Sequence, residues 1–316
     1  MRFAVYLPLL LPLLAPLGAR LIAERCEPRL ATWLLSASAL ALGTASTLCL
    51  GLLALTGLVR IPQLAALGHW APLTAHDDPA ALPVALAAGL LLGGATVMAV
   101  RFLLRRARTL AAAALDAACM PTRNGLVVVE DETPDAFALP GLPGRVVVST
   151  GMLRTLDADE HRILLAHERA HLTAHHYAFV ATAQLGAAAN PLLRPLARAV
   201  TYTIERWADE NAATATGDRR KVAHTVGKAA LAAQRHPGRA PGGALGFLGL
   251  RQRLERHGGR RPIGPVPRRV AALLAPPLTL HPALAAITVA VLAAATLASA
   301  EATHDLHALL RALGAW

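Results

Sequence analysis

The pentapeptide His167-Glu168-Arg169-Ala170-His171 combines two imidazoles and a carboxylate in a segment with helical character. A spacing of four residues puts His167 and His171 on one helix face, one turn apart, where both can ligate a single zinc ion. Zinc lowers the pKa of a water ligand to about 7 and polarises a carbonyl, and Glu168 can move the proton to a leaving amine. The pattern predicts zinc-dependent hydrolysis, although so short a match also arises by chance on a solvated helix.

A third protein ligand is needed, and His175 is the first candidate because it continues the same helix face. It lies eight residues beyond His167, which separates the two alpha carbons by about 12 Å, too far for one tetrahedral centre. We expect His175 and His176 to be polar residues at the C-terminal end of this helix, close to its last backbone carbonyls. The ligand must therefore come from another helix.

Glu205 supplies that ligand in the segment Glu205-Arg206-Trp207-Ala208-Asp209. Asp209 lies one turn later on the same face, where it can accept the N–H of a ligating histidine. Taken alone, Glu205 fits a surface glutamate equally well. Because the two motifs occur together, the sequence predicts one Zn²⁺ per chain held by His167, His171 and Glu205.

These motifs require two helices to carry them. Asp157 and Glu160 form a capping-box pattern at the start of a helix that is expected over 158–176. A second helix is expected over 196–216, where Gly217 ends it. The uncharged segment 177–193 between them either dips towards a membrane or forms a buried helix, and the helix-breaking Asn-Pro pair at 190–191 favours the second alternative.

Two β-branched segments precede the first helix, at 125–129 and 145–149. Turn-forming residues bound each of them, so both are predicted to be strands. The strands can form a hairpin or lie as neighbours in one sheet.

The composition indicates a membrane protein, because hydrophobic residues make up 54% of the chain and charged residues only 16%, against about 25% charged in soluble domains. A membrane-crossing helix needs about 20 apolar residues. Uncharged segments of suitable length occupy 3–19, 30–59, 79–100 and 282–300. The first contains three prolines, and the alternative for it is a secretory signal.

The distribution of arginine predicts the orientation of these four helices. Arginines cluster at 20–29, at 101–108 and at 268–269, whereas the other loop and the C-terminal tail have few. Arg and Lys favour the cytoplasmic side, and four intact spans place every cluster there, with both termini external. The net charge of +11 is then explained by membrane topology. Aromatic residues make up only 4% of the chain and are not interleaved with a basic stripe, so no nucleic-acid binding is expected. The three cysteines are expected to be reduced.

The predicted fold is therefore a mainly α membrane protein in which a cytoplasmic α+β metalloprotease domain is inserted between the third and fourth spans. The expected parts are three spans within 1–104, the protease domain at 105–235, a flexible basic linker at 236–281, the fourth span at 282–300 and a short external tail at 301–316.

The motifs resemble those of the BlaR/MecR-type integral membrane metallopeptidases, family fifty-six of the metallopeptidase classification. The resemblance includes the segment 134–138, the strand 146–149 leading to Gly151-Met152-Leu153, and Asn190-Pro191-Leu192 ahead of Glu205. It implies a gluzincin-like fold in a plasma-membrane protein, with zinc on His167, His171 and Glu205 and with Glu168 as general base. It is specific over 134–209 and weak elsewhere.

The resemblance also implies a role, which is cleavage of a cytoplasmic protein, such as a transcriptional repressor, in a signalling response. About sixteen residues follow the fourth span, fewer than a sensor domain requires, so detection of beta-lactams is not expected. The same motifs resemble the HtpX and CAAX-type proteases, which act on misfolded or prenylated membrane proteins. A non-catalytic signal transducer is the alternative of another class, but a pseudoenzyme usually loses a ligand or the base.

The Gly- and Pro-rich linker is a candidate site of self-cleavage, as the resemblance implies. Residues 236–267 contain little that could be buried, so extending them into a protease site costs little. The alternative is a passive tether to the fourth span.

Overall fold

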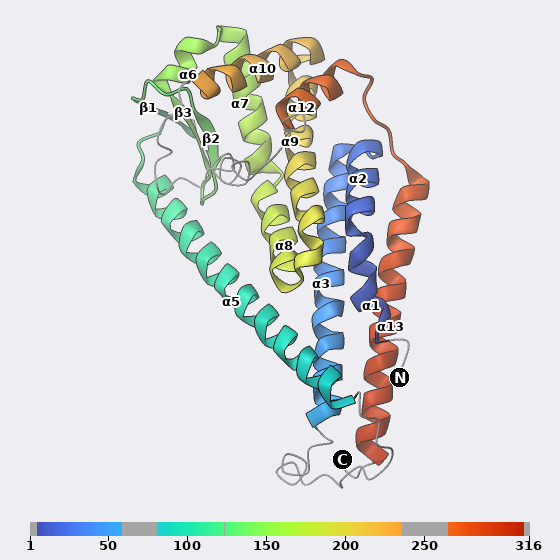
Figure 1. Cartoon of the computed structure of the whole chain (residues 1–316). Helices are drawn as coiled ribbons and strands as arrows, with labels where there is room; N and C mark the ends of the chain where they lie inside the picture. Colours follow the sequence, from blue (N-terminus) through green and yellow to red (C-terminus); the bar gives the residue numbers. More distant parts are fainter. Residues whose placement is uncertain (1–4, 59–80, 123, 236–264, 313–316) are drawn as a thin grey trace.

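The computed structural model describes residues 5–58, 81–122, 124–235 and 265–312, and most of these residues are helical (Figure 1). The predicted linker segment 236–264 lies outside the described residues, as does the loop at 59–80. In chain order the elements are α1 (Leu7–Leu10), η1 (Leu11–Leu14), α2 (Ala15–Arg25), α3 (Pro28–Leu58), α5 (Ala81–Cys119), β1 (Leu126–Val129), β2 (Ala136–Leu139), β3 (Arg145–Ser149), α6 (Thr150–Thr155), α7 (Ala158–Thr173), α8 (His176–Ala189), η2 (Pro191–Leu193), α9 (Arg194–Thr216), α10 (Arg219–Arg235), α12 (Pro265–Leu274) and α13 (Pro282–Ala312).

Four helical stretches of the described chain are long and apolar enough to cross a membrane, judged by length and composition. They are Leu7–Arg25, Pro28–Thr56, Leu82–Cys119 and Pro282–Ala308. The third extends beyond the predicted span at 79–100, because α5 continues without a break to Cys119. No Gly or Pro lies between residues 100 and 119 to interrupt it.

The prolines of the first stretch are accommodated by contacts with other helices. Pro12 has no N–H, so the carbonyl of Pro8 lacks its helical donor. The hydroxyl of Ser46 on α3 donates to that carbonyl at 3.1 Å, and Nδ2 of Asn190 donates to the same hydroxyl at 3.1 Å. These two bonds connect α1, α3 and the turn between α8 and α9.

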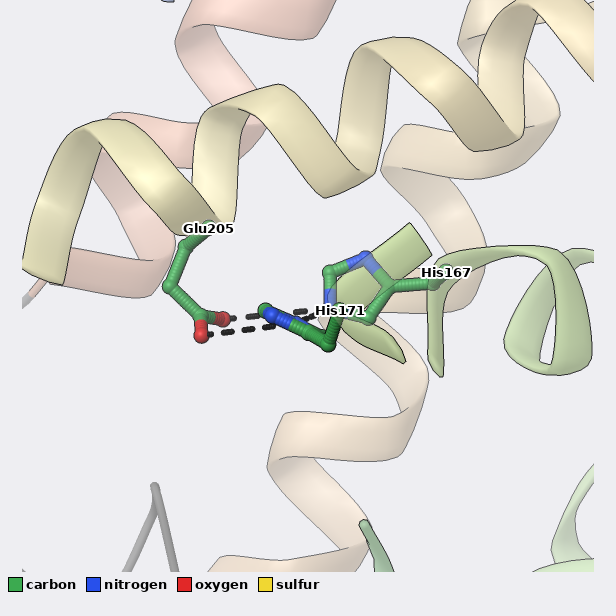
Figure 2. Close-up of side chains that lie close together, drawn as sticks. All are labelled: His167, His171 and Glu205. Carbon is green, nitrogen blue, oxygen red and sulfur yellow. Dashed lines mark hydrogen bonds and ion pairs between the residues drawn. The ribbon is translucent and has the colours of Figure 1, made fainter. Parts of the chain in front are cut away.

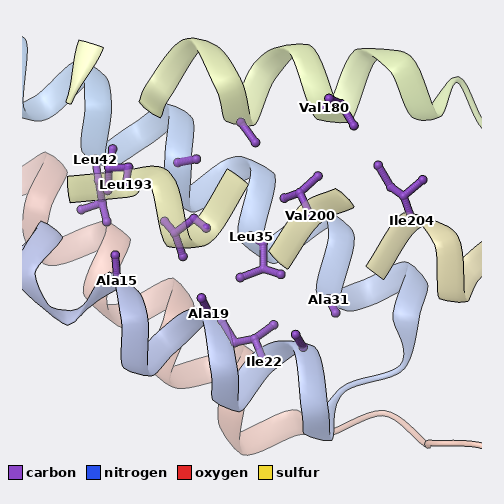
Figure 3. Packing of buried hydrophobic residues seen from close by; sticks show 14 of the residues in the cluster. Ala15, Ala19, Ile22, Ala31, Leu35, Leu42, Val180, Leu193, Val200 and Ile204 are labelled. Atoms are coloured by element: carbon purple, nitrogen blue, oxygen red, sulfur yellow. The ribbon is translucent and has the colours of Figure 1, made fainter. Parts of the chain in front are cut away.

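The largest core cluster lies where α2, α3, α8 and α9 meet (Figure 3). Leu35 of α3 and Val200 of α9 are fully buried in it. Helices α3 and α8 approach closely at Gly186, where an added Cβ would lie 2.2 Å from the carbonyl oxygen of Ala39. Segment 177–193 thus forms mainly the buried helix that the sequence favours, and α9 holds its position against the apolar bundle.

The sheet has the strand order β1-β3-β2. β1 and β3 are neighbours, as predicted, but they pair in parallel, so the hairpin alternative is wrong. The hairpin partner of β3 is β2, a strand that the pattern of β-branched residues did not predict because its sequence is Ala-Phe-Ala-Leu. β2 lies at an edge of the sheet, on the side of α7 and α9 (Figure 1).

Helix α7 begins with the predicted capping box, in which Asp157 accepts from the N–H of Glu160 and Glu160 accepts from the N–H of Asp157. It ends earlier than predicted, at Thr173, because His175 adopts a left-handed conformation with φ of 51°. His176 consequently starts the next helix, α8. Helix α9 ends at Gly217, which has φ of 74°, as the sequence predicts.

Part of the predicted linker is folded. α12 occupies 265–274 and presents Val266, Val270 and Leu273 on one face, with Leu273 buried against α9 and α10 residues. The interpretation of 236–281 as uniformly flexible is therefore wrong for this helix. After it, α13 extends from the predicted fourth span into the predicted tail.

Candidate metal centre

Three side chains from two helices converge on one point (Figure 2). Nε2 of His167 and Nε2 of His171, both on α7, are 3.2 Å apart. Glu205 of α9 places one carboxylate oxygen 3.9 Å from Nε2 of His167 and the other 3.7 Å from Nε2 of His171. The structure thus brings together the three residues that the sequence predicts as metal ligands.

The spacing of these atoms fits zinc. Zinc binds imidazole nitrogen and carboxylate oxygen at about 2.0–2.2 Å, so two ligand atoms of a tetrahedral ion lie roughly 3.3 to 3.5 Å apart. The separations of 3.2, 3.7 and 3.9 Å bracket that value. Two imidazoles and a carboxylate leave a fourth tetrahedral position for water or substrate, which is the ligand pattern of catalytic zinc sites.

Asp209 stands behind His167, as the sequence predicts. Its Oδ1 lies 3.0 Å from Nδ1 of His167, the nitrogen on the far side of the ring from the cluster. A carboxylate at that distance favours the tautomer with hydrogen on Nδ1 and keeps Nε2 available for a metal. Burial opposes a charged His167, but the Asp209 carboxylate outweighs burial and raises the pKa of His167.

Arg269 is a site residue that the sequence pattern indicated only as part of the arginine cluster beside the fourth span. Its Nε and Nη2 donate to the two oxygens of Asp209 at 2.8 and 2.6 Å, and its Nη1 donates to Oε2 of Glu205 at 2.6 Å. Burial raises the pKa of both carboxyls, yet the guanidinium outweighs burial and holds both pKa values below their usual range. One signal could have revealed this buried arginine. Positions 266, 270 and 273 are apolar at helical spacing, and position 269 lies on the same helix face.

His176 also differs from the prediction. It is the first residue of α8 and is fully buried, not a polar residue at the C-terminal end of the motif helix, and its Nδ1 lies 2.9 Å from Nδ1 of His171. Its ring packs 4.6 Å from that of Trp207 on α9. Burial lowers the pKa of His176 to about 3 and that of His171 to about 4, so both imidazoles are neutral at pH 7 and His171 is in the form that binds metal. His175, in contrast, is exposed, as expected for a helix-end residue.

Glu168 lies on α7 beside the three candidate ligands, and its side chain is almost fully buried. Burial raises the pKa of this carboxyl to about 7; the positive charge of His167 opposes the shift and the negative charge of Glu205 adds to it. A carboxyl with a pKa near the operating pH is suited to accept and then release a proton.

A cavity that opens to solvent contains Glu168 and the three converging side chains in its wall. Because Ile163 and Leu172 also line it, the cavity extends along α7 on both sides of the motif. The N-terminal end is apolar. Its wall there includes Met152, Ile163, Leu164, Val222, Val226 and Ala229, with Thr225 as a polar member.

The opposite end of the cavity is formed by Leu172, by Tyr177 of α8 and by Arg106 of α5, and β2 contributes the side wall with Ala136 to Ala138. Ser149 donates its N–H to the carbonyl of Asp135. Since hydrogen-bonded pairs alternate along antiparallel strands, the N–H and C=O groups of Ala136 and Ala138 point away from β3, towards the free edge of the sheet.

Two histidines a turn apart, a carboxylate from a second helix, a buried glutamate and an adjacent edge strand together form the type of site found in zinc metallopeptidases. Residues 103–188 match the family model described as Peptidase family M48, which supports a metallopeptidase family for this chain. M48 peptidases are zinc-dependent. The matched region contains α7 with its motif and ends before Glu205. No curated protein matches the chain.

The match does not confirm the predicted resemblance to the BlaR/MecR type. It supports the broader conclusion that the chain is a membrane-associated metalloprotease and is compatible with the HtpX-like alternative.

Proposed function

We propose that this protein is an integral membrane zinc endopeptidase whose metal is held by His167, His171 and Glu205. The proposal rests on one observation: three potential metal-ligand atoms lie together beside the buried Glu168. They lie in the wall of a cavity that is bordered by an edge strand of the sheet. Zinc bound there supplies Lewis acidity, which polarises the scissile carbonyl and acidifies water.

The residues of this chain perform the proton transfers and hold the geometry. Glu168 accepts the proton of the attacking water on its carboxylate and delivers it to the leaving nitrogen, a role for which a pKa of about 7 suits it. Asp209 holds the ring of His167, and Arg269 holds the carboxylate of Glu205 through Oε2, so both side chains would be oriented for a metal.

The substrate is a segment of protein chain in extended form. Among the described strands none pairs with the outer edge of β2, so the backbone groups of Ala136 and Ala138 can add a strand by hydrogen bonding, the mode in which many proteins capture extended peptides. The strand would run past Glu168 with side chains entering the cavity. Its apolar end under α10 suits a large apolar side chain next to the cleaved bond.

The site faces the cytoplasm in this proposal, with the protease domain between the third and fourth spans and both termini external. Two contacts support it. Nη1 of Arg206 on α9 donates to the carbonyl of Ala23 at the end of α2, and the guanidinium of Arg29 lies 5.7 Å from the ring of Trp207. The site therefore adjoins the α2–α3 corner, whose arginines mark the cytoplasmic side.

For the biological role, the match to family M48 favours an HtpX-like or CAAX-type protease that acts on membrane proteins. The second candidate is cleavage of a cytoplasmic repressor in a signalling response, which the segment 134–138 and the Asn190-Pro191 motif favour through their similarity to the BlaR/MecR type. A repressor gene adjacent to the gene for this chain would favour the second role. Self-cleavage within 236–267 remains a proposal for either role.

The test compares wild type with Glu168→Gln, purified in detergent and expressed in cells. We expect both proteins to bind one zinc per chain, and only wild type to cleave an unfolded protein such as casein, because the amide keeps the shape of the side chain but removes the base. In cells, the true substrate is the protein whose fragments disappear in the variant. Equal cleavage by both proteins, or a His167→Ala protein with full zinc content, would refute the proposal.

A further inference from the structure

Arg106 differs from the other arginines of α5 in where its side chain lies. Arg101, Arg105 and Arg108 are exposed, as expected for residues that meet water and lipid headgroups at the end of a span. Arg106 is half-buried, and it belongs to the helix stripe 102-106-110-113-117, whose last two members, Ala113 and Ala117, are buried in a core cluster. The Arg106 side chain is therefore directed at the protein.

The guanidinium of Arg106 has no acidic partner within ion-pair distance among the described residues. Its Nη2 donates to the backbone carbonyl of Tyr177 at 3.2 Å, a contact that joins α5 to the start of α8. Its Nε is shielded from solvent and has no hydrogen-bond partner in the described part of the chain. A desolvated cation that lacks a counter-ion is costly, so protein arginines in such places usually pair with a carboxylate or a phosphate.

The other partly or fully buried arginines near the site show what is unusual here. Arg269 lines the same cavity, and two carboxylates neutralise it. Arg206 also has an unpartnered Nε, but it lies beside the ring of Tyr202, outside the cavity, where Glu210 is close enough to feel its charge. Arg145 of β3 also has an unpartnered Nε, but it does not line the cavity. Of these four arginines, only Arg106 is in the cavity wall and lacks an acidic partner among the described residues.

We propose that Arg106 is a substrate-binding residue that pairs with a carboxylate of the peptide being cleaved, and so selects substrates with an acidic residue near the cut. The inference rests on the proposed function and adds the class of substrate to it. Arg106 lies at the end of the cavity formed by Leu172 and Tyr177, opposite the apolar end beneath α10. A peptide on the edge of β2 would pass both ends, with an apolar side chain entering one and an acidic side chain reaching the other.

A phospholipid headgroup is the other source of an anion close to a membrane span. The orientation of Arg106 argues against it, because the exposed arginines at 101, 105 and 108 already occupy the outward faces of α5, while Arg106 shares its cavity with Glu168. An extended peptide reaches that cavity along the sheet edge.

The experiment uses full-length protein in detergent and a set of extended peptides that differ only in carrying Glu or Gln at one position. Hydrogen bonds to charged groups contribute enough to change kcat/KM roughly 10- to 150-fold. We expect wild type to prefer Glu over Gln by such a factor at one position, mainly through KM. Arg106→Gln should lose this preference, whereas Arg105→Gln, the matched change on the exposed face, should keep it.

Binding of the same peptides to Glu168→Gln protein, measured by fluorescence anisotropy, tests Arg106 without turnover. Loss of the Glu preference in Glu168→Gln/Arg106→Gln supports the inference even if no peptide is cut, while absence of cleavage by zinc-loaded wild type counts against the proposed function alone. Equal binding of Glu and Gln peptides at every position would overturn the inference. It would also be overturned if Arg106→Gln altered only the dependence of activity on anionic lipid in nanodiscs.

Discussion

Replacing Arg269 by methionine removes the one guanidinium that contacts both Asp209 and Glu205 among the described residues, while keeping most of the volume of the side chain. In the folded protein three hydrogen bonds of 2.6 to 2.8 Å connect this arginine to the two carboxylates. The side chains of Arg269 and Asp209 are 7% and 2% exposed, so water cannot replace the lost partner. The variant would hold two neighbouring carboxylates in a dry environment without their counter-charge.

The expected cost follows from that burial. Removing one partner of a buried ion pair typically destabilises a protein by about 3–5 kcal/mol, because an uncompensated charge remains. The neighbouring residue provides a matched control, since Arg268 pairs with Glu24 and both side chains are 45% exposed. Exposed pairs contribute about 0–1 kcal/mol. Arg268→Met should therefore be mild although it lies on the same helix.

The assay is amide hydrogen exchange of α9 and α12 in detergent-solubilised protein without zinc, which gives the free energy of local opening. We expect Arg269→Met to lower this free energy by about 3–5 kcal/mol, and zinc to restore part of the loss by supplying positive charge beside Glu205. Adding Asp209→Asn to Arg269→Met should also restore stability, because the second change removes the buried charge. Equal effects of Arg268→Met and Arg269→Met, or a double variant less stable than Arg269→Met, would refute this reasoning.

Three further predictions concern other parts of the structure. Asp209→Asn should weaken zinc binding or activity about 10- to 100-fold, whereas Glu168→Gln should keep its zinc; a zinc titration in which Asp209→Asn equals wild type would remove the supporting role of Asp209. Glu160→Gln should destabilise α7 by up to about 1 kcal/mol at pH 7, because the amide can still accept the N–H of Asp157 in the capping box but loses the ion pair with Lys228. Burial raises the pKa of Glu160, but Lys228 and the N–H of Asp157 outweigh burial and lower it. The extra stability of wild type over Glu160→Gln should therefore be complete above the unfolded pKa of about 4.3 and disappear as the pH falls through the folded pKa. A stability difference that persists in acid would contradict this role of Glu160. Gly186→Ala should lower the thermal unfolding temperature, because its Cβ would lie 2.2 Å from the carbonyl oxygen of Ala39. Gly227→Ala, with no atom within 4 Å of its Cβ, should raise this temperature slightly. A shift in the same direction for both variants would show that α3 and α8 adjust freely.

The local parts of the site could be predicted from sequence. The spacing of His167 and His171 fixes their common helix face, and Asp157 with Glu160 defines where that helix begins. Glu205 and Asp209 are likewise related by one helical turn, and Gly217 ends their helix as expected. Each of these features depends on residues a few positions apart, so hydrogen bonding within a single helix determines it.

Long-range contacts could not be predicted in the same way. Arg269 belongs to an arginine pair that has the same sequence appearance as the other basic clusters beside the spans, and only packing of α12 against α9 distinguishes it from its exposed neighbour. The same holds for Arg106 among the arginines of α5. Charge alone predicted the side of the membrane, but burial decides which guanidinium enters the site.

The sequence by itself determined the motif chemistry, the candidate ligands, the apolar helices, the start of α7 and the end of α9. Tertiary structure decided that His176 is buried against His171, that β2 is an edge strand beside the cavity among the described strands, and that Arg269 holds Glu205 and Asp209. The physical reason is that helix periodicity is a property of neighbouring residues. Desolvation and ion pairing depend on which distant elements pack together, and a single sequence does not specify that packing in its local pattern.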